Sequence, residues 1–136
     1  MQESNKQYFN HLKIHSQYSI CEGAIKIENL KDFCKENKIH SLGLSDTSNM
    51  FGALEFAENI SKVGTQPIIG TQINFKFEDT IGLLSLIALN EKGYKKIIEL
   101  SSRSYLENQT LSEPFLDLEV LANIMSRSPI DSSTVL

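Results

Sequence analysis

The run Pro67-Ile68-Ile69-Gly70-Thr71-Gln72-Ile73-Asn74-Phe75-Lys76-Phe77 predicts a long strand, around which the other expected elements can be ordered. From Ile73 onward apolar and polar side chains alternate strictly, which indicates one buried face. Three further strands are expected over residues 8–15, 41–45 and 83–89. The chain therefore predicts four strands, with the quoted run as the third.

Helical patterns fill the intervals between these strands. The first helix is indicated by apolar residues at helical spacing, namely Ile27, Leu30, Phe33 and Cys34. Further helices are expected over 52–63, 91–105 and 117–125. Strands that alternate with helices at this spacing are typical of βαβ units. The predicted fold class is α/β, with a mainly parallel sheet or an incomplete barrel.

Composition limits both the class of protein and its partners. With 136 residues, 40% of them hydrophobic and 22% charged, the chain is expected to form a single globular domain over 1–136. The serine-rich residues 126–136 are expected to be a loosely held tail. A formal net charge of −4 argues against a surface that neutralises nucleic-acid phosphates, so any DNA connection is expected to be indirect.

Cysteine spacing and the N-terminus predict the compartment. Cys21 and Cys34 have no CxxC spacing, and the first ten residues, MQESNKQYFN, contain no apolar signal region. No segment approaches the roughly 18–20 apolar residues that a membrane span requires. We therefore expect a reduced, cytoplasmic setting and no membrane partner.

Three polar residues gather where strands are expected to end. His15, Asp46 and Gln72 lie at or near the C-terminal ends of the first three strands, where α/β folds collect their functional groups. On the first strand, His11, Lys13 and His15 share one face. A lysine thus stands between two potential metal ligands, which suggests a metal site that has been disabled.

Each candidate ligand also has an ordinary structural interpretation. A metal site would draw on five residues: His11, His15, Glu22, Asp46 and His40. His11 is equally compatible with the edge of the core, His40 with a solvated position after a helix, and Asp46 with a helix cap. Glu22 can simply be solvated. These alternatives stay open on the residues alone.

Other common chemistries lack their motifs. The sequence contains no GxxxxGK[ST], GxGxxG, HExxH or GxSxG pattern, so the usual nucleotide-binding and hydrolase sites are not indicated. A nucleophile–base pair of Cys21 and His15 has no third residue that would orient it.

Several ordered blocks together resemble a known family. They read FNHLKIHSQYS over 9–19 with CEGA over 21–24, LSDTSNMFGALEF over 44–56, KVGTQPIIGTQ over 62–72 and LNEKGY over 89–94. They resemble the opening of the PHP (polymerase and histidinol phosphatase) domain of bacterial DNA polymerase III alpha subunits. The resemblance implies a partial, distorted βα barrel, about half of a complete PHP domain. Intact members bind a metal cluster that is often used for phosphoester hydrolysis.

The family's ligand motifs map onto six positions: Lys13, His15, Glu22, Asp46, Thr47 and Gln72. Lys13 replaces the first histidine of an HxH pair, Thr47 replaces the histidine of TDHGN, and Gln72 replaces a glutamate. The resemblance thus implies a vestigial metal site with no catalytic residue. No metal is expected; any that bound would use His15, Glu22 and Asp46. One hypothesis places the Lys13 ammonium in the cation position, paired with Asp46 or Glu22.

The resemblance also implies a function. We expect an N-terminal PHP portion of a replicative DNA-directed DNA polymerase, a nucleotidyltransferase that uses Mg²⁺ in parts beyond this chain. This portion is expected to be catalytically inactive, to have a structural role, and to dock the proofreading exonuclease subunit and the rest of the polymerase III holoenzyme. The alternative is an active PHP phosphoesterase or 3′–5′ exonuclease that uses Zn, Mn or Mg. A third possibility is a domain without activity or partner of its own.

Overall fold

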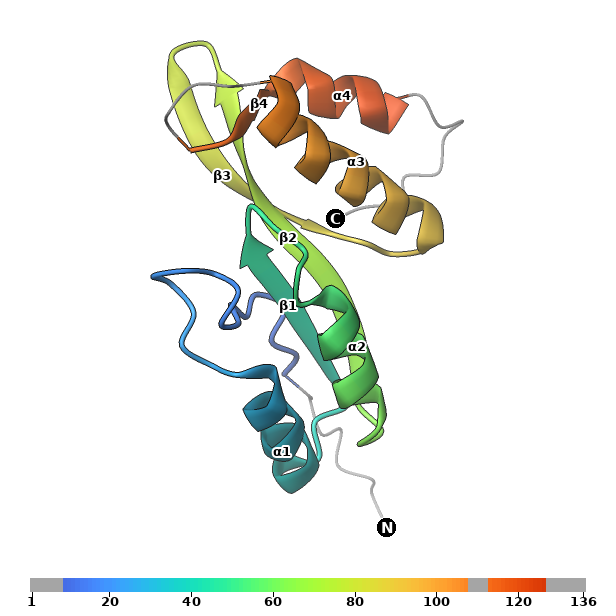
Figure 1. The fold of residues 1–136 in the computed structure, drawn as a ribbon. Helices are drawn as coiled ribbons and strands as arrows, with labels where there is room; N and C mark the ends of the chain where they lie inside the picture. Colours follow the sequence, from blue (N-terminus) through green and yellow to red (C-terminus); the bar gives the residue numbers. More distant parts are fainter. Residues whose placement is uncertain (1–8, 108–112, 127–136) are drawn as a thin grey trace.

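A computed structural model describes residues 9–107 and 113–126 (Figure 1). The elements follow the order α1 Ile27–Asn37, β1 Ser41–Thr47, α2 Ala53–Ser61, β2 Gln66–Phe77, β3 Thr80–Ile87, α3 Glu91–Glu107, β4 Phe115–Asp117 and α4 Leu118–Ser126. The predicted α/β class is confirmed, as are all four expected helices to within a few residues. The tail expected over 126–136 lies almost entirely outside the described residues.

The long strand β2 organises the sheet. Residues Gln66–Gln72 pair in parallel with β1, and Asn74–Lys76 pair in parallel with β4. Strand β3 pairs with Gly70–Phe77 in the antiparallel direction. In Figure 1, β2 runs from the half that holds α1, β1 and α2 into the half that holds β3, β4, α3 and α4. The strand predicted from the 67–77 run is therefore confirmed as the element that joins the two halves.

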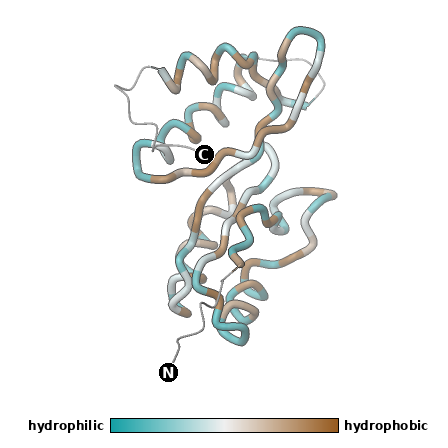
Figure 2. The backbone as a smooth tube through the Cα atoms, turned by 180° about the vertical axis from the view of Figure 1, so that it is seen from behind, coloured by the Kyte–Doolittle hydropathy of each residue, from teal (hydrophilic) through white to brown (hydrophobic). Residues whose placement is uncertain are grey.

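Each half has its own apolar core. The first combines α1, β1 and α2 through Ile27, Leu30, Cys34, Leu42, Leu44, Phe56 and Ile60. The second combines the C-terminal part of β2 with β3, β4, α3 and α4 through Ile73, Phe75, Leu86, Ile97, Leu100, Leu116 and Ile124. The tube in Figure 2 changes between brown and teal along the helices, as expected for helices with one apolar side.

Two strand predictions need correction. The strand expected over 8–15 is reduced, within the described residues, to isolated bridges of Ile14 with Leu44 and Ser16 with Ile25. The sheet is also less parallel than expected, because β2 and β3 are joined by only two residues, 78 and 79. A two-residue connection permits only antiparallel pairing, since parallel strands require a long crossover.

The buried face of α1 is also narrower than predicted. Ile27, Leu30 and Cys34 of α1 are buried, whereas Phe33 is exposed. Both cysteines are free thiols, Cys21 exposed and Cys34 buried. No helix in the described part of the chain is both long and apolar enough to cross a membrane.

Candidate functional site

The candidate site lies at the end of β1, beside the middle of β2. Gln72 was expected at or near a strand end, but β2 continues beyond it to Phe77. Thr47, the last residue of β1, pairs with Gln72 of β2. The segment before α1 runs beside β1, where the Ile14 amide donates to the Gly43 carbonyl at 3.2 Å and the Ser45 amide donates to the Ile14 carbonyl at 2.8 Å. A Cβ at Gly43 would lie 2.7 Å from the Leu12 backbone, so this close approach depends on glycine. The pairing brings His15 and Ser16 beside Asp46.

Asp46 is held in a cage of hydrogen-bond donors. Its side chain is buried, with 1% exposure. Oδ1 accepts from the Ser16 amide at 2.7 Å and from the Ser19 hydroxyl at 2.6 Å, and Oδ2 accepts from the Ser16 hydroxyl at 2.7 Å. We call Ser16, Ser19 and Asp46 the serine cage. Three short bonds to a charged acceptor satisfy this buried carboxylate without a cation.

A second group of polar side chains lies beside the cage. Within it, Glu22 is exposed, His15 and Thr47 are half-buried, and Gln72 is buried. The Thr47 hydroxyl donates to Glu22 Oε2 at 2.5 Å and lies 3.5 Å from Oε1 of the Gln72 side chain. His15 Nδ1 lies 3.5 Å from the Thr47 hydroxyl and 3.7 Å from Glu22 Oε2. Nε2 of the Gln72 side chain donates to the Ser85 hydroxyl at 2.8 Å. We call His15, Glu22, Thr47 and Gln72 the mouth cluster.

Ser19 connects the two groups. Its hydroxyl donates to Asp46, accepts from the Thr47 amide at 3.0 Å, and lies 3.4 Å from His15 Nδ1. Sequence reasoning missed both Ser16 and Ser19. The available signal was indirect: a carboxylate predicted at a buried strand end requires donors, and hydroxyls in the adjoining segment can supply them.

Asp46 does not cap α2, although the sequence left that interpretation open. The residue before α2 is Gly52, and no side chain caps that helix. Asp46 bonds instead to the serines, so the cap interpretation is wrong. The Asn49 side chain serves the turn before α2, where its Oδ1 accepts from the Phe51 amide at 3.1 Å.

Comparison with known proteins shows which family has this arrangement. A model of the PHP domain matches residues 11–130, which is most of the chain. The chain belongs to the PHP domain family. The predicted resemblance is therefore confirmed at the level of the family.

Relatives at the sequence level are polymerase subunits. The DNA polymerase III subunit alpha of Caulobacter vibrioides is 38% identical over 127 residues, covering 84% of this chain and 11% of that protein. The corresponding subunit of Rickettsia felis is 39% identical over 114 residues, covering 83% of this chain and 9% of that protein. The PHP chain thus spans about a tenth of the length of these relatives.

A solved structure supports the fold. A protein from Bifidobacterium adolescentis, assigned as a metal-dependent phosphoesterase, matches with a TM-score of 0.56 and 15% identity, over 90% of this chain and 40% of that one. At this identity the likeness concerns the fold alone. It confirms the predicted partial PHP barrel.

Lys13 does not have the partner that one hypothesis gave it. The side chain is exposed, and the ion pairs found within residues 9–107 and 113–126 do not include Lys13. The pairing with Asp46 or Glu22 is therefore wrong. Its physical reason is that the serine cage already supplies Asp46 with donors, so the buried carboxylate needs no ammonium.

The other two histidines lie outside the site. His11 stacks edge-on against Phe9 at a ring-centroid distance of 4.7 Å and lines a separate apolar pocket with Ile25 and Phe33. His40 precedes β1, at the strand end opposite to Thr47. Of the three histidines in the chain, only His15 reaches the candidate site.

The donors that are present do not fit a PHP metal cluster. Among the described residues, no group of three or more His, Cys, Asp or Glu side chains is arranged to hold a metal ion. With the Asp46 oxygens bonded to serines, one imidazole and one carboxylate remain beside a neutral hydroxyl and a neutral amide. Protein zinc sites use at least three nitrogen, sulfur or carboxylate ligands, and a cluster requires more.

Proposed function

We propose that this chain is the N-terminal PHP portion of a replicative DNA polymerase alpha subunit, with a structural and docking role in place of metal-dependent catalysis. The polymerase III relatives at 38–39% identity support the parent role, which is DNA-templated DNA synthesis. The nucleotidyl transfer and its Mg²⁺ belong, in this proposal, to parts of the polymerase other than these 136 residues.

The serine cage carries the proposal for an inactive site. A carboxylate that coordinates a cation must offer it lone pairs, and donors of the chain itself occupy three of the roughly four acceptor sites of Asp46, including both on Oδ1. A cation bound through Oδ1 would displace the Ser16 amide or the Ser19 hydroxyl and leave that buried donor unsatisfied, at a cost of about 1–3 kcal/mol. The chain thus stabilises the site in a form that does not need metal.

The docking partner that we propose is the proofreading exonuclease subunit of the same polymerase. The negative net charge favours a protein partner over direct contact with DNA. Exposed apolar side chains beside the mouth cluster, such as Phe51 and Ile20, supply the contact area that such a partner requires.

An active metal-dependent phosphoesterase is the second candidate, because His15 and Glu22 remain 3.7 Å apart at the mouth. Metal analysis of the purified chain, combined with hydrolysis of p-nitrophenyl phosphate esters in Mn²⁺ and Zn²⁺, distinguishes the two candidates. We expect neither stoichiometric metal nor turnover. One bound metal per chain, together with hydrolysis that a chelator abolishes, would establish the phosphoesterase instead.

A further inference from the structure

A cleft beside the mouth cluster combines apolar walls with negative charge. Its volume is about 470 Å³. Four large apolar side chains from separate segments line it while remaining exposed to solvent: Ile20, Phe51, Leu83 and Tyr105. Phe51 is 77% exposed and Ile20 is 86% exposed, although isolated large side chains of this kind usually gain by burial. Their convergence on one cleft indicates a contact surface.

The loop that presents Phe51 is held by hydrogen bonds. The Asn49 side chain donates to the Tyr18 carbonyl at 2.9 Å and accepts from the Phe51 amide. The Tyr105 hydroxyl donates to the Ser48 carbonyl at 2.8 Å and thereby ties α3 to the same loop. A loop backbone held in this way loses little conformational entropy on binding, which favours affinity.

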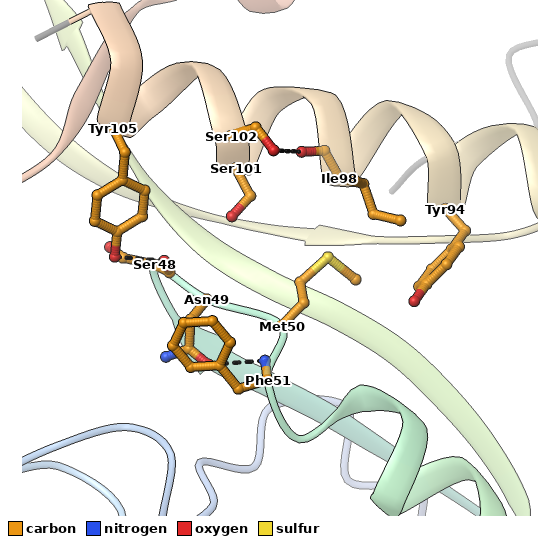
Figure 3. Close-up of a pocket in the computed structure, with 9 residues that line it drawn as sticks. All are labelled: Ser48, Asn49, Met50, Phe51, Tyr94, Ile98, Ser101, Ser102 and Tyr105. Atoms are coloured by element: carbon orange, nitrogen blue, oxygen red, sulfur yellow. Dashed lines mark hydrogen bonds between the residues drawn. The ribbon is translucent and has the colours of Figure 1, made fainter.

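A second cavity adjoins the first across this loop (Figure 3). It has a volume of about 480 Å³ and adds Met50, Tyr94 and Ile98 to residues that both cavities share, among them Phe51 and Tyr105. No charged side chain is present among the described residues that line it. In Figure 3 the Met50 side chain points from the loop toward α3, so the second cavity presents an apolar floor.

Negative charge is confined to the first cavity. Glu22 and Glu113 are the charged side chains among the described residues that line it, and no Lys, Arg or His accompanies them there. Glu22 accepts one hydrogen bond from Thr47 and lies 3.7 Å from His15 Nδ1, which is outside the lining of the cavity, and Glu113 accepts one hydrogen bond from Asn74 at 3.3 Å. Carboxylates accept several hydrogen bonds when ionised, so both retain capacity for a cationic donor.

We propose that this cleft docks a segment of the partner polypeptide in which a Lys or Arg lies next to a large apolar residue. The cationic group would contact Glu22 and Glu113, and the apolar side chain would pack against Phe51 and Tyr105. The proposal rests on the docking function above and gives it a surface and a chemistry. A nucleic acid is disfavoured, because its phosphates would face two carboxylates.

Isothermal titration of the full chain with the purified proofreading exonuclease subunit of the same genome tests this assignment. Phe51→Ser is compared with Phe33→Ser, which removes an exposed phenylalanine from α1 outside the cleft. Glu113→Lys is compared with Glu119→Lys, an exposed carboxylate of α4 outside the cleft. We expect Kd to rise about 30-fold for Phe51→Ser and about tenfold for Glu113→Lys, with both controls within about twofold of wild type.

The titrations test the cleft and the docking function separately. If the wild-type chain binds and neither cleft variant weakens binding, the cleft is wrong and docking stands. If Phe51→Ser weakens binding and Glu113→Lys does not, the proposed cationic contact is wrong. If the wild-type chain shows no binding, the docking function fails and the cleft assignment fails with it. Thermal melting of each variant verifies that it is folded, and exposure of Phe51 and Glu113 keeps both changes outside the cores.

Discussion

The serine cage and the mouth cluster lie side by side, yet their polar groups are satisfied in different ways. In the cage, three donors lie 2.6–2.7 Å from the oxygens of one buried carboxylate. In the mouth cluster one hydrogen bond is short, and the distances from His15 to Thr47 and Glu22 are 3.5 and 3.7 Å. The difference shows that the Asp46 carboxylate is fixed within the structure, whereas His15 and Glu22 of the mouth cluster are held less tightly and reach solvent.

The largest loss of stability is expected for Asp46→Ala. This change removes the acceptor of three buried donors, and we expect the free energy of unfolding to fall by about 3 kcal/mol or more. Glu22→Ala is the matched control, because it removes an exposed carboxylate from the mouth cluster and is expected to change stability by about 0.5 kcal/mol or less. Urea unfolding followed by circular dichroism measures both. If both variants lost the same free energy of unfolding, the serine cage would not be more important for stability than the mouth cluster.

Ser19→Ala is expected to have an intermediate effect. It removes one of the donors to Asp46 and the acceptor of the Thr47 amide, so we expect a loss of about 1–3 kcal/mol in the free energy of unfolding. Ser102→Ala serves as the control, because Ser102 lies on α3 with an exposed hydroxyl bond to the Ile98 carbonyl. If Ser19→Ala is as mild as this control, the cage depends on Ser16 alone.

Restoring the ligands tests the mapping of the mouth. The triple variant Lys13→His, Thr47→His, Gln72→Glu adds an imidazole and a carboxylate within the mouth cluster and a second imidazole two residues before His15. Because a divalent cation then has several charged or imidazole donors, we expect a titratable Zn²⁺ site that the wild-type chain lacks. Lys13→His alone is the control and is expected to add no site. Unchanged metal affinity in the triple variant would contradict the assigned positions.

The smallest effect is expected for the pKa of Tyr18, whose side chain lines the cleft. Its hydrogen bond to Glu55, followed by the negative charge of that carboxylate, raises the pKa of Tyr18 above the ordinary value of 10.0. Because the folded pKa is raised, stabilisation from this bond is present below about pH 10 and is lost as the pH rises through the folded pKa. Phenolate absorbance during alkaline titration should show Tyr18 ionising at lower pH in Glu55→Gln than in the Glu58→Gln control. Identical titration curves would contradict the coupling.

Much of the fold could be predicted from local pattern. The strict alternation after Ile73 identified β2, and helical spacing identified α1, because both depend on which face each residue buries. The direction of β3 depended on the two-residue connection over 78–79, a turn signal that the alternation does not contain. The N-terminal strand was overestimated, because residues 9–16 pair with other segments only through the isolated bridges at Ile14 and Ser16, and a turn begins at Gln17.

The site was only partly predictable for a related reason. Family motifs identified His15, Glu22, Thr47 and Gln72, which the structure brings together. The cage was missed because serine is common in turns, and only the folded backbone shows that the Ser16 and Ser19 hydroxyls point to one carboxylate. The predicted pairing of Lys13 with Asp46 was wrong for the same reason, because the Ser16 and Ser19 hydroxyls already donate to that carboxylate.

The central claim is that the cage satisfies Asp46 without a metal ion. Urea unfolding of the wild-type chain with and without saturating Mn²⁺ tests it most directly, because a ligand that binds only the folded state stabilises it, by about 2.7 kcal/mol at one hundred times its dissociation constant. We predict an unfolding midpoint that Mn²⁺ leaves unchanged. A midpoint that rises with Mn²⁺ concentration, and no longer does so in Asp46→Asn, would contradict the account.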